Sequence, residues 1–158
     1  MEKRVGILGF AHGHVMGYGG NWVSHPELGV KIVAGWDHDK TRLENCTKQL
    51  GGIGMADTVE ELLAMDIDAV VVSSETSMHA DLIEKAAAAG KTIICYKPMA
   101  LHLSDADRIV AAVEKYKVPF TMGYQMRVDP QNIKIKELIK SGEIGDIFMY
   151  RRRHSLYK

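Results

Sequence analysis

Short apolar runs alternate with helical patterns along the whole chain, and this order constrains the fold more than any other feature. The strongest run lies in Asp68–Val72, whose last four residues are continuously apolar, as expected of a strand covered on both faces. Strands that alternate with helices at this spacing predict an α/β fold, a doubly wound parallel sheet with helices on both faces. The other apolar runs are Arg4–Leu8, Lys31–Trp36, Thr92–Cys95 and Phe120–Met122.

Local signals predict several helix ends. Thr58-Val59-Glu60-Glu61 has the capping-box pattern of a helix start. The helix expected over Ser77–Ala89 stops at Gly90, and Asp129-Pro130 predicts an N-cap followed by proline at the first helical position. The first helix is the weakest prediction, because each of its glycines costs up to about 1 kcal/mol relative to alanine. These glycines are Gly13, Gly17, Gly19 and Gly20.

The composition is that of one globular domain and argues against several classes of partner. The 158 residues are 46% hydrophobic and 25% charged, with a formal net charge of +0, so nothing favours nucleic acid or a membrane surface. Cys46 and Cys95 lack metal-ligand spacing, as in a reduced protein. The N-terminus lacks the apolar segment of a signal peptide, and no apolar run approaches the roughly 20 residues of a membrane span. We therefore expect a cytoplasmic protein.

The first strand leads into Gly9-Phe10-Ala11-His12-Gly13-His14, where a dinucleotide fingerprint has G-x-G-x-x-G. Only the first glycine matches, since Ala11 and His14 replace the other two. Asp37 ends the second strand, at about the position of an acid that binds the ribose hydroxyls of NAD. No arginine follows it directly to bind a 2′-phosphate, which favours NAD over NADP. The alternative is that Asp37 caps the next helix.

Lys97-Pro98 follows the apolar run Thr92–Cys95. A lysine at the end of a buried strand is costly unless its ammonium has a partner or a function, and the proline ends the strand pairing. Ligands of open α/β sheets bind outside the carboxyl ends of the strands. Lys97 is therefore a candidate catalytic or substrate-orienting residue, with a purely structural strand end as the alternative.

Three histidines allow more than one interpretation. His12 and His14 have the spacing of a metal-binding pair, but nothing nearby supplies a third ligand, so we predict polar loop residues and no metal site. His79 lies in the first turn of a helix, just beyond Ser73-Ser74-Glu75-Thr76. It belongs either to a site at the carboxyl edge of the sheet or to the helix start, as a capping or solvent-facing residue.

Together these residues resemble the Gfo/Idh/MocA oxidoreductase family, and the resemblance covers essentially the whole chain. It implies an N-terminal NAD(P)-binding Rossmann domain, a C-terminal α/β substrate domain, and hydride transfer on sugars, inositols or related polyols. The segments that carry it are Gly9, Asp37, His79 in a Thr-x-x-His context, Lys97-Pro98-Met99-Ala100, Gly123-Tyr124-Gln125-Met126-Arg127 and Ser141-Gly142-Glu143-Ile144-Gly145.

The resemblance also implies roles for particular residues. Lys97 would donate to or polarise the reacting oxygen, with an acid/base partner in the C-terminal domain. NAD is the implied cofactor, with NADP possible, and the partners are a polyol or sugar substrate and, in the full-length form, further copies of the chain. Tyr96 departs from the family, which usually has glutamate there. The implied cofactor-binding residues are Gly9, Phe10, Ala11, His12, Gly13, His14, Asp37, Ser73, Ser74, Thr76, His79, Lys97, Pro98 and Gln125.

The end of the chain departs from the alternating pattern. We expect residues 1–144 to form the dinucleotide-binding domain and residues 145–158 to begin a substrate domain that is absent or truncated. Gly145–Tyr150 reads as a strand without a covering helix, either of that domain or at the edge of the main sheet. A non-catalytic dinucleotide- or sugar-sensing protein of the same fold is the alternative function, and a structural module without a ligand is a third.

Overall fold

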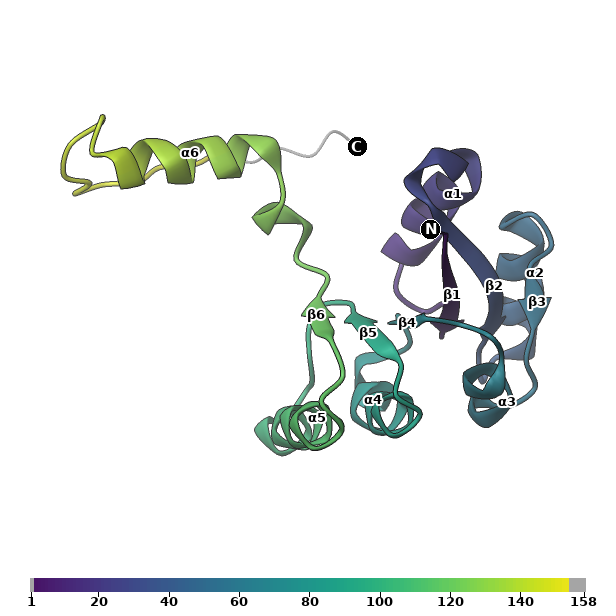
Figure 1. Ribbon diagram of the computed structural model, residues 1–158. Helices are drawn as coiled ribbons and strands as arrows, with labels where there is room; N and C mark the ends of the chain where they lie inside the picture. The colour runs from purple at the N-terminus through teal and green to yellow at the C-terminus, as the bar shows by residue number, and fades with distance from the viewer. Residues whose placement is uncertain (1, 154–158) are drawn as a thin grey trace. The chain divides into compact units, whose positions relative to one another are not determined.

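Six parallel strands form the central sheet of the computed structural model, which describes residues 2–153. Their order is β3-β2-β1-β4-β5-β6, and every neighbouring pair is parallel (Figure 1). This order confirms the predicted doubly wound α/β fold. Successive strands are added on one side of β1 up to β3 and on its other side from β4 onward, so the strand order switches between β1 and β4. The strands are β1 (Lys3–Leu8), β2 (Val30–Trp36), β3 (Gly54–Met55), β4 (Ala69–Val72), β5 (Thr92–Cys95) and β6 (Phe120–Met122).

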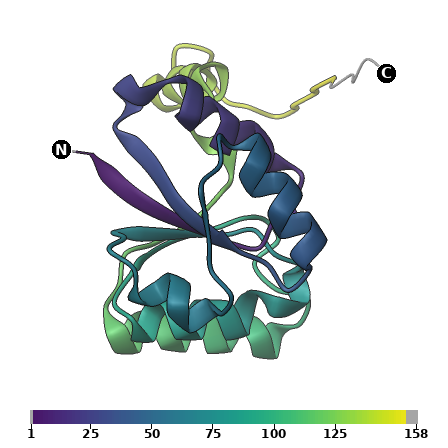
Figure 2. The same ribbon diagram turned by 90° about the vertical axis from the view of Figure 1, so that its right-hand side faces the viewer.

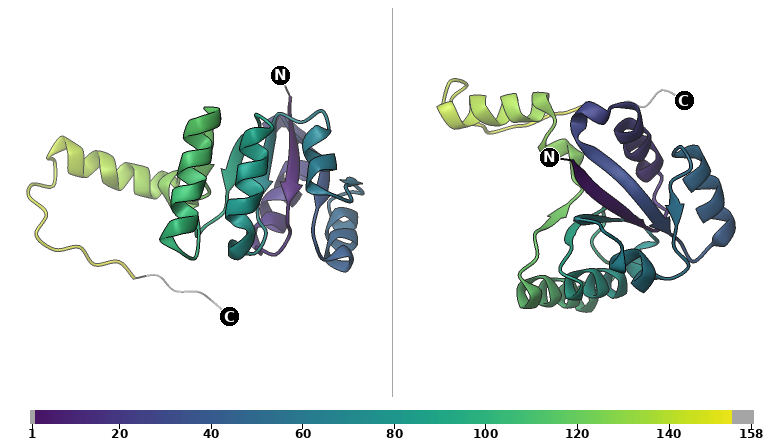
Figure 3. Two further views of the ribbon diagram at one scale, coloured as in Figure 1. Left: turned by 90° about the horizontal axis from the view of Figure 1, so that it is seen from below. Right: turned by 45° about the vertical axis from the view of Figure 1, so that its right-hand side comes forward.

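Helices cover both faces of this sheet (Figures 2 and 3). Helices α1 and α2 pack on one face, and α3, α4 and α5 pack on the other. None of the helices in residues 2–153 is long and apolar enough to cross a membrane. The helices are α1 (His14–Ser24), α2 (Lys40–Gln49), α3 (Val59–Ala64), α4 (His79–Ala88), α5 (Leu103–Tyr116) and α6 (Pro130–Ser141), with 3₁₀ turns η1 (Pro26–Leu28), η2 (Thr76–Met78) and η3 (Gln125–Arg127).

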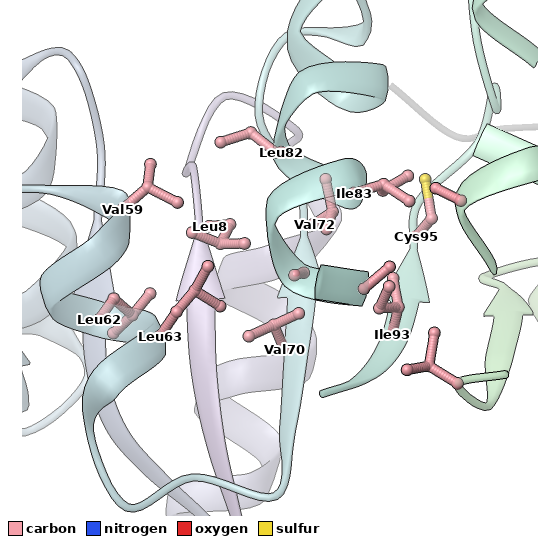
Figure 4. Packing of buried hydrophobic residues seen from close by; sticks show 14 of the residues in the cluster. Leu8, Val59, Leu62, Leu63, Val70, Val72, Leu82, Ile83, Ile93 and Cys95 are labelled. Atoms are coloured by element: carbon pink, nitrogen blue, oxygen red, sulfur yellow. The ribbon is translucent and has the colours of Figure 1, made fainter. Parts of the chain in front are cut away.

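The central position of β4 in the sheet explains why residues 69–72 are continuously apolar. Val70 and Val72 belong to the core beneath α3 and α4, which Figure 4 shows, whereas Val71 belongs to the core beneath α1 and α2. All three side chains are fully buried. Because successive side chains of a strand point to opposite faces, a strand covered on both sides must be apolar at every position.

The predicted helix starts are confirmed with small shifts. The Thr58 hydroxyl accepts a hydrogen bond from the Glu61 amide at 3.1 Å, but the Glu61 carboxylate accepts from the amide of Asp57, at 2.7 Å, one residue before the usual partner. Asp129 caps α6 as predicted. The helix expected from Ser77 begins at residue 79 instead, because η2 precedes it. The ends of the other predicted strands and helices agree within one or two residues, which is the usual uncertainty of such boundaries.

The first helix forms despite its glycines, and two of these glycines differ in their surroundings. A Cβ atom on Gly19 would lie 3.0 Å from Leu50 Cδ2, whereas a Cβ atom on Gly17 would meet nothing within 4 Å. We expect Gly17→Ala to raise the free energy of unfolding by about 0.5–1 kcal/mol, because alanine loses less backbone entropy on folding. Urea denaturation measures the change. Gly19→Ala is the matched control, and an equal gain there would contradict the explanation.

The sheet contains one strand that the sequence pattern did not indicate. Strand β3 consists of two exposed edge residues that pair with Ala34 and Gly35 of β2. It has no apolar run, because an edge strand of two residues buries almost no side chain. Backbone pairing alone therefore defines it, and such pairing leaves no trace in the hydrophobic pattern.

The chain divides into two compact units, residues 1–123 and 124–158. The second contains η3, α6 and a segment without regular structure. Residues 145–153 form no strand and are not part of the six-stranded sheet, so the edge-strand alternative for Gly145–Tyr150 is wrong, and its assignment to a substrate domain stays a prediction. An extended segment without a partner makes no ladder hydrogen bonds. The domain boundary at residue 144 stays a prediction.

Candidate functional site

The loop after β1 makes a tight turn against the loop after β4. Gly9 has φ +88°, and a Cβ atom there would overlap the backbone of Ser74. The Ser73 hydroxyl donates to the Gly9 carbonyl at 2.5 Å, and the His12 amide donates to the Ser73 carbonyl at 2.9 Å. Only glycine combines the left-handed conformation with this close approach. The turn thereby brings the start of α1 to the carboxyl edge of the sheet.

The start of α1 is open on its outer side. Ala11 and Gly13 are exposed, and a Cβ atom on Gly13 would meet nothing within 4 Å. The first turn of α1 contains no acidic residue. The helix dipole makes such a terminus suited to an anion. The turn therefore has the shape and the charge to accept a pyrophosphate.

Phe10 and Asp37 contribute to the site in different ways, which the sequence pattern did not distinguish. The Phe10 side chain is buried in the core, and only its backbone amide reaches the site, where it donates to Asp37 Oδ2 at 2.7 Å. Asp37 is fully buried and also accepts from the Asp39 amide and from Arg42. Asp39, not Asp37, caps α2 by accepting from the Arg42 amide at 3.0 Å. The helix-cap alternative for Asp37 is therefore wrong.

The charge of Asp37 is held by its donors. Burial raises the pKa of this carboxyl, but hydrogen bonds from Arg42 and from the backbone amides of Asp39 and Phe10 outweigh burial and bring the pKa below its ordinary value. Asp37 is therefore ionised at neutral pH. An ionised carboxylate is the kind of acceptor that a hydroxyl group binds, but the acceptor positions of Asp37 are taken here by the Phe10 and Asp39 amides and by Arg42.

Arg42 and Glu75 join Asp37 in one cluster that sequence reasoning missed. Arg42 Nη2 lies 2.7 Å from Asp37 Oδ1 and 2.8 Å from Glu75 Oε1, and His38 Nδ1 lies 3.4 Å from Asp37 Oδ1. Arg42 is five residues beyond Asp37, and Glu75 comes from the loop after β4. No local motif links these positions, so only the folded sheet brings them together.

Four aromatic rings, those of His12, His14, Tyr18 and Tyr96, lie close to one another near the start of α1. The centroid distances are 4.9 Å for His12–His14, 5.2 Å for His12–Tyr96, 5.9 Å for His14–Tyr18 and 5.9 Å for Tyr18–Tyr96. Burial, His14 and Lys97 lower the pKa of His12, so His12 is neutral at pH 7. Burial also raises the pKa of Tyr96. The ring at position 96 therefore supplies an uncharged packing surface directly before Lys97.

His79 is fully buried at the start of α4, so the solvent-facing alternative is wrong. Its Nδ1 atom lies 3.1 Å from the Met99 carbonyl, and its Nε2 atom lies 3.3 Å from the Ser74 carbonyl. Its side chain does not cap α4. His79 thus connects the loop after β4 with the loop after β5 through its two ring nitrogens, and it supports both loops at the carboxyl edge of the sheet.

Lys97 lies at the carboxyl end of β5, where the sequence placed it, and its side chain is exposed. The peptide bond to Pro98 is cis. The neighbouring Tyr96 is buried, and its amide donates to the Val72 carbonyl at 3.0 Å. The strand is therefore fixed up to Tyr96, and Lys97 is the first residue free to face a ligand.

The predicted site residues of the first unit meet at one edge of the sheet, at the carboxyl ends of β1, β2, β4 and β5. Gln125 belongs to the second unit, where it opens η3, and its part in the site stays a prediction. Within residues 2–153, no group of three His, Cys, Asp or Glu side chains could hold a metal ion. The residues brought together are Gly9, Phe10, Ala11, His12, Gly13, His14, Asp37, Ser73, Ser74, Thr76, His79, Lys97 and Pro98.

A parallel sheet in this order, with a glycine turn at the start of α1 and an acid at the end of β2, defines a Rossmann-type dinucleotide-binding domain. Residues 3–124 match the model of the Gfo/Idh/MocA family, an oxidoreductase family with an NAD-binding Rossmann fold. The chain belongs to this family.

Curated relatives and a solved structure agree with this assignment. The chain is 35% identical over 124 residues to scyllo-inositol 2-dehydrogenase (NAD(+)) of Bacillus subtilis, a match over 78% of this chain and 36% of the relative. It is 33% identical over 152 residues to inositol 2-dehydrogenase 1 of Saccharopolyspora erythraea, over 92% and 44%. The fold matches scyllo-inositol dehydrogenase of Lactobacillus casei with bound NAD(H) and scyllo-inositol (TM-score 0.79, 24% identity, 92% and 43% covered). The chain thus spans less than half the length of these relatives.

Proposed function

We propose that this chain is the cofactor-binding half of an NAD-dependent oxidoreductase that acts on an inositol, a sugar or a related polyol. The observation that carries the proposal is the open start of α1, where the exposed residues Ala11 and Gly13 follow Phe10, whose amide binds the buried carboxylate of Asp37. The pyrophosphate of the dinucleotide would bind at this turn and the adenosine ribose at Asp37. The names of the relatives support the inositol class of substrate.

In this proposal each residue has a limited chemical task. Bound NAD supplies the acceptor for a hydride. Lys97, exposed at the end of β5, donates a hydrogen bond to the reacting oxygen and so stabilises the charge that develops on it. Tyr96 fixes the backbone just before the lysine through its buried ring and its amide. The proposed enzyme is cytoplasmic, forms homo-oligomers and accepts NADP as the second choice of cofactor.

A sensor that binds a dinucleotide or sugar without catalysis is the second candidate. Tyr96 favours it, because the ring removes the carboxylate that the family usually has beside the lysine, and His14 favours it as a departure from the fingerprint. Turnover separates the two candidates, since both would bind the dinucleotide.

The binding site can be tested with one charge placed at the start of α1. We expect calorimetry to detect NADH binding to the chain and Gly13→Asp to weaken it about tenfold or more, because the new carboxylate repels the pyrophosphate. The same variant should keep or raise the thermal stability, since aspartate is a favoured N-cap and Gly13 has open space around it.

Gly20→Asp is the matched control, because it adds the same charge to the same helix at a position that is also open. It should leave the NADH dissociation constant within about twofold. Equal weakening in both variants would contradict a pyrophosphate site at the start of α1. Failure of the unchanged chain to bind either NADH or NADPH would favour the structural module.

A further inference from the structure

The hydrogen bonds of Asp37 leave no acceptor free for a ligand. Oδ2 accepts from the Phe10 amide and from Arg42 Nε, and Oδ1 accepts from the Asp39 amide and from Arg42 Nη2, at 2.7–2.9 Å. Each carboxylate oxygen has about two acceptor positions. The two amides belong to backbone that the fold holds in place. A ribose that bonds to Asp37 must therefore displace the guanidinium of Arg42.

Glu75 is placed to receive the guanidinium that Asp37 releases. Its Oε1 atom already lies 2.8 Å from Arg42 Nη2. Its Oε2 atom is buried and has no hydrogen-bond partner among the described residues, with His38 Nδ1 at 3.7 Å. Glu75 thus has an unused acceptor beside Arg42. A bidentate pair between Arg42 and Glu75 would keep the existing bond to Oε1 and add one to Oε2, which replaces one of the two hydrogen bonds that Arg42 loses at Asp37.

The same contact bears on the choice between the two nicotinamide dinucleotides. These differ by a 2′-phosphate on the adenosine ribose, and a free arginine at this place would favour the phosphate. In this cluster the arginine is shared by two carboxylates, so Asp37, Arg42 and Glu75 together carry one negative charge when His38 is neutral. A phosphate would meet a negative cluster, whereas a hydroxyl would meet the acceptor positions of Asp37 that Arg42 vacates when it moves to Glu75.

We propose that Glu75 is a specificity-determining residue that keeps Arg42 away from the ribose 2′ position and so makes the site select NAD(H) over NADP(H). This inference rests on the proposed function, since it concerns the same dinucleotide. It adds a residue from the loop after β4 to a choice that the sequence pattern assigned to Asp37 alone.

Dissociation constants for NADH and NADPH, measured by calorimetry on the unchanged chain and on Glu75→Gln, test the proposal. Glutamine keeps the shape but removes the charge, so Arg42 becomes available to the 2′-phosphate. We expect the ratio of the NADH constant to the NADPH constant to shift toward NADPH by about tenfold or more. Glu75→Asp keeps the charge and should retain most of the original preference.

Two further variants make the test specific. Glu84→Gln is the matched control, because Glu84 lies 2.7 Å from an arginine, Arg108, and belongs to α4 outside the site. It should leave the ratio unchanged. Adding Arg42→Gln to Glu75→Gln should abolish the gain for NADPH, since the arginine is the group that would bind the phosphate.

An unchanged ratio of the NADH and NADPH dissociation constants in Glu75→Gln would overturn the role of Glu75. A gain for NADPH that persists without Arg42 would do the same. Neither result would contradict the proposed binding of NADH. Parallel weakening of both dinucleotides would also overturn the role of Glu75, because it would make Glu75 a purely structural residue. An unchanged chain that binds neither dinucleotide would overturn this inference together with the proposed function. Circular dichroism and thermal unfolding of each variant check that the fold is retained.

Discussion

Replacing Lys97 with methionine should lower turnover about 100-fold or more while leaving NADH binding nearly unchanged. Methionine keeps most of the length and the apolar character of the side-chain stem but cannot donate a hydrogen bond to the reacting oxygen. Loss of a positioned proton donor typically costs about 10²–10⁴-fold in rate. Because Lys97 is exposed beyond the last fixed residue of β5, its replacement should not disturb the core. Steady-state kinetics and calorimetry on the same preparations measure the two effects.

The assay requires this chain joined to a substrate-binding domain, with polyols screened in the presence of NAD. Lys31→Met is the matched control, because Lys31 is also exposed but lies near the amino end of β2, at the opposite edge of the sheet. Its turnover should stay within about twofold of the unchanged protein, as for a surface site away from the chemistry. Full turnover in Lys97→Met would make Lys97 a structural strand end and would favour the sensor.

Gly9→Ala should lower the free energy of unfolding by about 3 kcal/mol or more. Alanine at φ +88° costs about 1–2 kcal/mol, and its Cβ atom would overlap backbone and side-chain atoms of Ser74, which adds the strain of an overpacked site. A domain of this size has only about 5–15 kcal/mol of stability, so the loss is large. Denaturant unfolding followed by circular dichroism measures it.

Gly13→Ala provides the comparison, because Gly13 has φ −58° and open space where a Cβ atom would lie. Its stability should change by less than about 1 kcal/mol. Similar losses in the two variants would mean that the contact between Gly9 and Ser74 does not limit the turn.

Some site residues could be predicted because a local pattern defines them. Gly9 follows the first strand directly, Asp37 follows the second strand directly, and Lys97 stands between a strand and a proline. Their positions at the carboxyl edge are correct. The burial of His79 and the capping of α2 by Asp39 were not visible, because both depend on which neighbouring loop supplies the hydrogen-bond partner.

The sequence by itself determined the order and type of the main elements, because strands and helices bury apolar residues at different, characteristic spacings along the chain. It also determined where the chain must turn, through Gly9 and through the N-cap Asp129. Only the tertiary structure decided that Arg42 and Glu75 meet at Asp37, and that residues 145–153 form no strand. The ion pair between Arg42 and Glu75 joins residues 33 positions apart, and strand pairing also requires a distant partner, so the geometry that brings these partners together exists only after the sheet has formed.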